Sequence, residues 1–161
     1  MTRTVRIRPL QPQPFAPFGD VLEVSGRADK IINQGLCRRF HDRARLDFGD
    51  GRAGISLFDA EPRALPYELG MMERHPDGSQ AFVPMHRADW LVIVAPDRDG
   101  APAAPQAFRA APGQGVNLHR NIWHGVLTPL HSPGIFAVID RIGAGANLEE
   151  HWFDTSWLVR D

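Results

Sequence analysis

The 161-residue sequence has a single cysteine, Cys37, and a single lysine, Lys30, and it has no apolar run of the length that a membrane-spanning helix needs, about 18 residues. One cysteine excludes an intrachain disulfide, which fits a reducing compartment. The amino-terminal segment has no apolar stretch typical of a signal peptide. The 18 basic and 19 acidic side chains give a formal charge of −1, without the basic excess of a nucleic-acid-binding protein. We therefore expect a cytoplasmic protein with no membrane or nucleic-acid partner.

What the sequence has in abundance is glycine and proline, 15 and 14 residues, which divide it into short segments. Its length suits one domain over residues 1–161. Apolar runs typical of β-strands lie between the Gly- and Pro-rich turns, at residues 5–7, 55–58, 81–85, 90–95, 116–118 and 135–139. We predict a mainly β sandwich or barrel with few short helices, one of them at 13–19, and an exposed loop at 97–105.

One of these runs, WLVIVA at residues 90–95, is apolar at every position instead of alternating. Such a strand is expected to be covered on both faces. In a chain of this length, a second copy of the protein is one candidate for that cover.

Two polar segments between strands hold the candidate functional residues. In the first, Glu73 and His75 share one face of an extended chain, and Gln80 and Phe82 share a face of the next strand. The second segment, residues 115–124, contains His119, Arg120, Trp123 and His124. Taken singly, each of these has a plain structural interpretation: a hydrogen-bonded histidine, a solvated ion pair, or a core tryptophan.

Their joint spacing resembles the two motifs of the cupin barrel. The first cupin motif, His-x-His, four residues, Glu, six residues, Gly, has Glu73, His75, Gln80 and Arg87 at its named positions here. The second motif, Pro-x-Gly-x-x-His, has His119, Asn121 and His124. The spacing is therefore retained, whereas two of the four metal-ligand types differ.

A narrower resemblance covers nearly the whole chain. The segments ELGMMERHPDGSQAFVPM, VNLHRNIWH and VIDRIGAGANLEE, together with FGDV and INQG, resemble the ureidoglycolate lyase family, also called ureidoglycolate hydrolase. Two positions depart from the family pattern. Arg87 stands where glycine is frequent, and Gly125 follows the last histidine where a second histidine is common.

The resemblance implies a fold and an activity. The fold is a cupin-type barrel, the jelly-roll or double-stranded β-helix, in a homodimer. The activity is the splitting of (S)-ureidoglycolate, a small-molecule substrate, into glyoxylate and urea during allantoin degradation. The family is also associated with nickel.

This reaction needs a base for the substrate hydroxyl and an acid for the departing nitrogen. The candidates are His75, His119, His124 and Glu73. If a divalent metal such as nickel is bound, its ligands are drawn from His75, His124, Glu73 and Gln80, but the sequence leaves open whether a metal is needed.

Further residues are candidates for binding the substrate. An arginine, Arg74 or Arg120, is expected to pair with the substrate carboxylate. Phe82 and Trp123 are candidate contacts, and Asp140 and Arg141 are expected to orient the other groups, unless they form an ordinary ion pair at a strand end. Two other functions stay open: a non-catalytic cupin that senses a small acid, and a different metal-dependent cupin enzyme.

Overall fold

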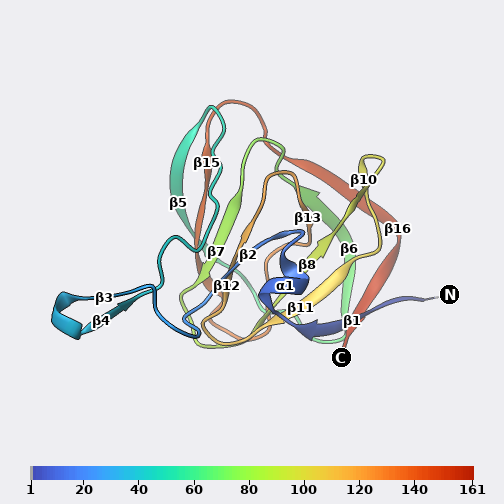
Figure 1. Cartoon of the computed structure of the whole chain (residues 1–161). Helices are drawn as coiled ribbons and strands as arrows, with labels where there is room; N and C mark the ends of the chain where they lie inside the picture. The colour runs from blue at the N-terminus through green and yellow to red at the C-terminus, as the bar shows by residue number, and fades with distance from the viewer. Residues whose placement is uncertain (1) are drawn as a thin grey trace.

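The computed structural model describes residues 2–161 and is built mainly from β-strands (Figure 1). Its helical segments are a single turn, α1 (Pro12–Phe15), and a 3-10 turn, η1 (Asn33–Gly35). The predicted mainly β fold with few short helices is confirmed.

One sheet closes on itself, and we call it the closed sheet. Its strand order is β11-β1-β16-β6-β13-β8-β14, and β11 also pairs with β8, so that six strands form a ring. The strands are β1 (Arg3–Pro9), β6 (Tyr67–Arg74), β8 (Trp90–Ala95), β11 (Gln106–Ala110), β13 (Trp123–His124), β14 (Thr128–Pro129) and β16 (Glu149–Arg160).

The second sheet, which we call the open sheet, has the strand order β2-β12-β7-β15-β5. Its strands are β2 (Gly19–Leu22), β5 (Arg52–Asp59), β7 (Gln80–Pro84), β12 (Gly115–Leu118) and β15 (Ile135–Ile142). Together the two sheets form the cupin-type barrel, and strand β5 forms one edge of the open sheet.

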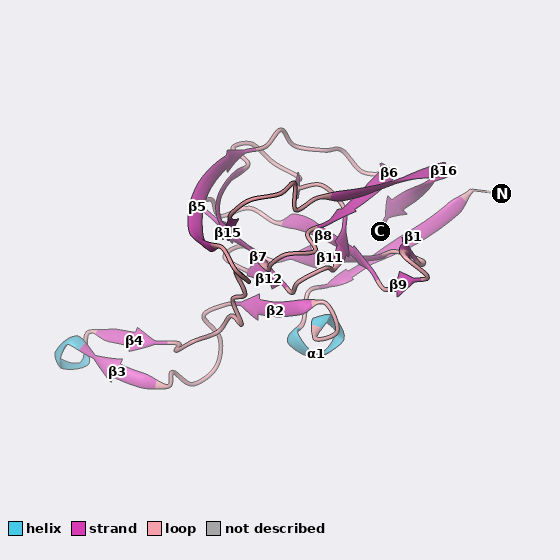
Figure 2. Ribbon diagram, turned by 90° about the horizontal axis from the view of Figure 1, so that it is seen from above, coloured by secondary structure: helices cyan, strands magenta, loops and turns pink. Residues whose placement is uncertain are grey.

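Two hairpins lie outside these sheets. Strands β3 (Lys30–Ile32) and β4 (Cys37–Arg39) pair with each other and project away from the barrel (Figure 2). Strands β9 (Asp97–Arg98) and β10 (Ala101–Pro102) form a hairpin in the segment predicted as a loop at 97–105. The turn between them needs two residues of positive φ, which Asp99 and Gly100 supply.

Strand β8 lies between two hydrophobic clusters, as its uninterrupted apolar sequence predicts. Trp90, Val92 and Val94 pack against the open sheet and α1, whereas Leu91 and Ile93 pack inside the ring of the closed sheet. Every residue of the strand is buried. Both faces are thus covered by the same chain, and the suggestion that a partner subunit covers this strand is wrong.

The predicted helix at 13–19 is shorter than expected. It ends at Phe15, and Gly19 already belongs to strand β2. Ala16 still has helical backbone angles, but Pro17 lacks the N–H that a continuing helix would use. The predicted strands are all present, most of them longer by a few residues.

No helix in the described part of the chain is long and apolar enough to cross a membrane.

Candidate active site

Three of the predicted residues meet where strands β6 and β13 come together. Glu73 is near the end of β6, His75 follows that strand, and His124 ends β13. One ligand atom from each of the three side chains lies within 4.8 Å of the other two. The imidazole rings of His75 and His124 have their centroids 5.2 Å apart. We call this group the His–Glu cluster.

Strand register explains why residues so far apart in the sequence meet, since His124 is paired directly with Glu73 across the antiparallel β6–β13 ladder. Side chains of directly paired residues lie on the same face of a sheet. Glu150, on β16, is paired with Glu73 from the other side. A row of three titratable side chains therefore crosses three adjacent strands.

Both histidines have one ring nitrogen held by a backbone carbonyl. His75 Nδ1 lies 2.8 Å from the carbonyl oxygen of Asn147, and His124 Nδ1 lies 2.9 Å from that of Gly125. A carbonyl only accepts, so each Nδ1 carries the proton. In this tautomer Nε2 is the acceptor atom of the ring, and the Nε2 atoms of both histidines are buried without a hydrogen-bond partner.

Burial sets the protonation of the cluster. Burial, with a smaller contribution from the neighbouring His75, lowers the pKa of His124 to about 4, against the hydrogen bond to Gly125. His124 is therefore neutral near pH 7 and able to accept a proton or bind a cation. Burial raises the pKa of Glu73; Glu150 adds to this rise and His75 opposes it. Its carboxyl group is thus closer to exchanging a proton near neutral pH than an exposed glutamate.

Gln80 and Asp140 face each other on paired strands β7 and β15. Gln80 Nε2 donates to Asp140 Oδ2 over 3.1 Å, so the amide oxygen points the other way. That oxygen, Oε1, is buried and has no partner. Phe82, two residues on, packs edge-on against the ring of His124 at 6.4 Å between centroids.

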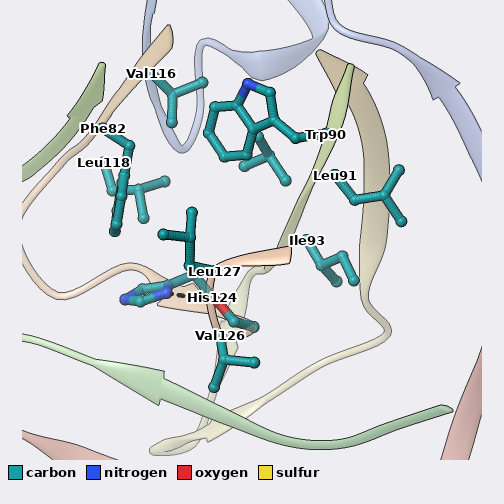
Figure 3. Close-up of a pocket in the computed structure, with 11 residues that line it drawn as sticks. Phe82, Trp90, Leu91, Ile93, Val116, Leu118, His124, Val126 and Leu127 are labelled. Atoms are coloured by element: carbon teal, nitrogen blue, oxygen red, sulfur yellow. Dashed lines mark hydrogen bonds between the residues drawn. The ribbon is translucent and has the colours of Figure 1, made fainter. Parts of the chain in front are cut away.

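His124 also borders a small cavity between the two sheets (Figure 3). It is the single titratable side chain among the residues lining this cavity. The others are Phe82, Trp90, Leu91, Val92, Ile93, Val116, Leu118, Gly125, Val126 and Leu127. This apolar wall keeps water from the inner side of His124, so a polar substrate is expected on the side of Glu73 and His75, which are only partly buried.

The two candidate arginines are already paired with carboxylates of the chain. Arg74 donates to Glu149 at 2.6 Å and to Asp97 at 2.7 Å, and its guanidinium lies over the Trp123 ring. The Trp123 indole also donates to Asp97. Trp123 belongs to the buried core of the closed sheet, as its structural interpretation expected.

Arg120 and Arg141 form separate ion pairs. Arg120 makes two hydrogen bonds of 2.8 Å to Asp47, and both side chains are about two-fifths exposed. Arg141 is almost fully buried and donates to Asp50 at 2.6 Å, not to the neighbouring Asp140. Adjacent residues of a strand point to opposite faces, so Asp140 faces Gln80 while Arg141 packs under the loop at Asp50.

His119 lies outside the His–Glu cluster. Its Nε2 is 3.1 Å from Asp20 Oδ2. The same carboxylate oxygen accepts hydrogen bonds from the Asn117 amide and the backbone N–H of Arg45. His119 thus belongs to a polar network on the outer side of the open sheet.

Two residues near the cluster were not singled out from the sequence. Asn147 supplies the carbonyl that holds His75, and its side chain accepts from the backbone N–H of Asp77 at 2.8 Å. Glu150 reaches the cluster only through the β6–β16 register. The glycine-rich turn before Asn147 is a visible signal in the sequence, whereas cross-strand pairing leaves none.

The cluster has the features of a divalent-metal site. Two imidazoles with unpartnered Nε2 atoms and a carboxylate are a donor set that first-row divalent ions bind. The Nδ1–carbonyl hydrogen bonds are the outer contacts that orient histidine ligands. Burial of two unpartnered acceptor atoms is otherwise costly, and a bound cation would satisfy them.

A cupin-type barrel that holds a partly buried histidine–carboxylate cluster is typical of one class of protein, the small-molecule enzymes of the cupin kind. A model of the family described as ureidoglycolate lyase matches residues 2–160. The chain is 60% identical to a ureidoglycolate lyase of Rhodobacter capsulatus, over 95% of this chain and 96% of the relative. It is 51% identical to ureidoglycolate lyase 2 of Rhizobium meliloti, over 95% of each. The chain therefore belongs to the ureidoglycolate lyase family.

Proposed function

We propose that this protein splits ureidoglycolate into glyoxylate and urea, with the His–Glu cluster as its active centre. The observation that carries the proposal is the approach of Glu73, His75 and His124 to within 4.8 Å in a chain of this family. Ureidoglycolate carries a hydroxyl group and a ureido nitrogen on the same carbon. The reaction breaks the carbon–nitrogen bond while the hydroxyl oxygen becomes the carbonyl of glyoxylate, and no water is consumed.

Glu73 is the group to which we assign the proton transfer. Its carboxylate accepts the hydroxyl proton on one oxygen and returns a proton to the departing nitrogen. Because both substrate groups are bonded to one carbon, a single carboxyl group can serve as base and then as acid. The raised pKa of Glu73 favours both halves of this exchange.

His75 and His124 present their Nε2 atoms to the same space, and we propose that these two atoms hold a divalent ion such as nickel, with Glu73 beside it as the group that transfers the proton. When bound, this ion stabilises negative charge on the substrate oxygen as the hydroxyl proton leaves. Gln80 adds a neutral oxygen, fixed in direction by Asp140. Without an ion, Nε2 of the neutral His124 ring can accept a hydrogen bond from the substrate hydroxyl group, while its lowered pKa leaves the proton transfer itself to Glu73.

Arg120 is our proposed partner for the substrate carboxylate. It borders the segment that carries His75, because its guanidinium donates to the Pro76 carbonyl at 3.3 Å. Its present partner, Asp47, is partly exposed, so a substrate carboxylate can take the place of Asp47 without being fully buried. Arg74 is enclosed by Asp97, Glu149 and Trp123 and is better suited to fixing the end of β6.

The test is to incubate the purified protein with ureidoglycolate and to measure urea and glyoxylate together. Equal release of both is expected. Ammonia in place of urea would indicate hydrolysis of the ureido group instead. A complete absence of turnover would contradict the proposal. The same assay distinguishes a non-catalytic sensor from an enzyme, although neither a sensor nor another cupin activity is favoured by the relatives, which are named as lyases.

Two further properties belong to the proposal. We expect the protein to act in the cytoplasm, as its single cysteine suggests, and as a homodimer, as the family resemblance implies. The surface on which such a dimer would form is argued next.

A further inference from the structure

The outer face of the open sheet carries a continuous apolar patch across strands β5, β15 and β7. Leu57 is paired with Ala137, and Ala137 with Val83, so these side chains form one row across three strands. Ile55 and Leu57 are 74% and 69% exposed. We call this patch the apolar face; it comprises Ile55, Leu57, Val83, Met85, Ala137 and Ile139. Apolar patches of this kind on a monomer mark interaction sites.

The β3–β4 hairpin is a second exposed apolar feature. It stands out from the barrel on the side of β5, as both views show (Figures 1 and 2). Leu36 at its tip is 87% exposed and Ile31 is 60% exposed. Each of its strands pairs with the other alone among the residues described. A two-stranded hairpin without a covering surface is marginally stable in water, so this one needs a surface to pack against.

The charges of the two features are complementary. The hairpin carries three exposed cations, Lys30, Arg38 and Arg39, none of which has an ion-pair partner in the described chain. The end of β5 and the residues after it carry Asp59 and Glu61, which are exposed and likewise unpaired there. Within the described chain no ion pair joins these opposite charges, so they are available to pair between two chains.

The area that a stable interface buries is larger than the apolar face alone, so the hairpin has to contribute as well. Two strands of eight residues and one of five, about 4.8 Å apart and rising about 3.4 Å per residue, give the apolar face a flat area of roughly 340 Å². A stable interface takes about 800 Å² from each partner. The apolar face alone is too small, so the hairpin has to supply much of the remainder.

We propose that two copies of this chain associate through a two-fold axis, with the hairpin of each copy lying against the apolar face of the other. Ile31 on β3 and Leu36 at the tip cover the partner's β5 side of the apolar face, and the hairpin cations meet the Asp59–Glu61 end. The contact is isologous, so it closes as a dimer and leaves neither feature free for further copies. It also covers β5, the exposed edge of the open sheet. This inference rests on the homodimer proposed above, not on the lyase activity.

The first experiment measures the oligomeric state of the full-length protein by light scattering and sedimentation. The wild type is expected to be a dimer, and Leu57→Glu to weaken the dimer at least about tenfold, since a charge buried in an interface is costly. Trp152→Glu is the matched control, because Trp152 is 68% exposed but lies on β16 of the closed sheet. A monomeric wild type, or a Leu57→Glu protein that dimerises like the control, overturns the proposal.

The second experiment tests the pairing of hairpin and sheet end by charge reversal. One variant carries Arg38→Glu and Arg39→Glu, and the other carries Asp59→Arg and Glu61→Arg. Each variant alone brings like charges together at both contacts and is expected to be mainly monomeric. An equimolar mixture restores opposite charges at both contacts and is expected to form a heterodimer of wild-type affinity. A mixture that stays monomeric contradicts the arrangement.

Failure of this inference is separable from failure of the proposed function. Oligomeric state is read without substrate, and urea release is read without regard to size. If the wild type is a dimer and every variant is a dimer as well, the proposed interface is wrong, and the lyase proposal is unaffected. Circular dichroism of the charge-reversed monomers checks that they are folded. A folded monomer excludes unfolding as the cause of dissociation.

Discussion

His75 Nδ1 lies 2.8 Å from the backbone carbonyl oxygen of Asn147, which joins the segment after β6 to the turn before β16. This hydrogen bond fixes which nitrogen of His75 faces Glu73 and His124. Asn147 itself has a positive φ of 46°, a conformation that asparagine tolerates better than most residues, and its side chain also holds the Asp77 N–H. Asn147 is therefore a positioning residue that acts on the cluster through His75.

Substitutions at Asn147 are expected to separate the contribution of its positive φ from that of its side-chain hydrogen bond to Asp77. Asn147→Asp keeps an acceptor and tolerates positive φ, so it should retain most activity, whereas Asn147→Ala loses both and should lower kcat by roughly tenfold to a hundredfold. Asn147→Gly keeps only the backbone freedom and should fall between them. Nitrogen NMR of His75 provides the second measurement, because loss of the Nδ1–H tautomer should follow the loss of kcat. Equal kcat and an unchanged tautomer in all three variants would contradict this role.

Removal of His124 tests the cluster directly. His124→Ala is expected to lower kcat/KM by about 10²–10⁴-fold, because a neutral buried acceptor is lost from the centre. His131→Ala is the control, since His131 is an exposed histidine paired with Asp89. Steady-state kinetics check the loss, and circular dichroism checks that the variant is folded. Near-normal turnover in a folded His124→Ala protein excludes His124 from the active centre.

A bound metal predicts linked changes in content and stability. Protein that binds an ion at the cluster should lose it to a chelator, with a lower Tm, because a ligand that binds only the folded state stabilises it. His75→Ala should show low metal content by elemental analysis before any chelation, while His119→Ala should keep the metal. Activity and Tm that are unchanged in metal-free protein would rule out a metal requirement.

The Asp20 network predicts sensitivity to acid. Burial raises the pKa of Asp20, but hydrogen bonds from Asn117, Arg45 and His119 outweigh it, so the pKa in the folded state is lowered. A carboxyl group with a lowered pKa stabilises the fold above its unfolded value, about 4, and this stabilisation is lost as the pH falls through the folded value. The free energy of unfolding, measured in urea, should therefore drop below pH 4 in the wild type.

The same measurement on Asp20→Asn supplies the comparison. That variant should be less stable near neutral pH and should lose less stability on acidification, because it has no charge to neutralise. Asp59→Asn, at an exposed and unpaired position, should titrate like the wild type. Parallel acid profiles for wild type and Asp20→Asn would show that this network does not contribute.

Sequence periodicity predicted what depends on neighbours along the chain. The apolar run of β8 predicted a strand covered on both faces, and the Gly- and Pro-rich turns predicted a mainly β fold. The shared face of Glu73 and His75 follows from the two-residue period of a strand. These features are local, since each depends on backbone geometry over a few residues.

Tertiary structure decided which charged groups are free and which are already paired. Arg74 and Arg120 look alike in the sequence, yet Arg74 is enclosed by Asp97 and Glu149, whereas Arg120 is paired with the partly exposed Asp47. His119 and His124 are five positions apart, and only strand register directs one to Asp20 and the other to Glu73. The physical reason is that the sequence determines which titratable side chains exist and on which face of a strand each lies. Their burial, tautomers and pKa values depend on contacts with residues distant in the chain.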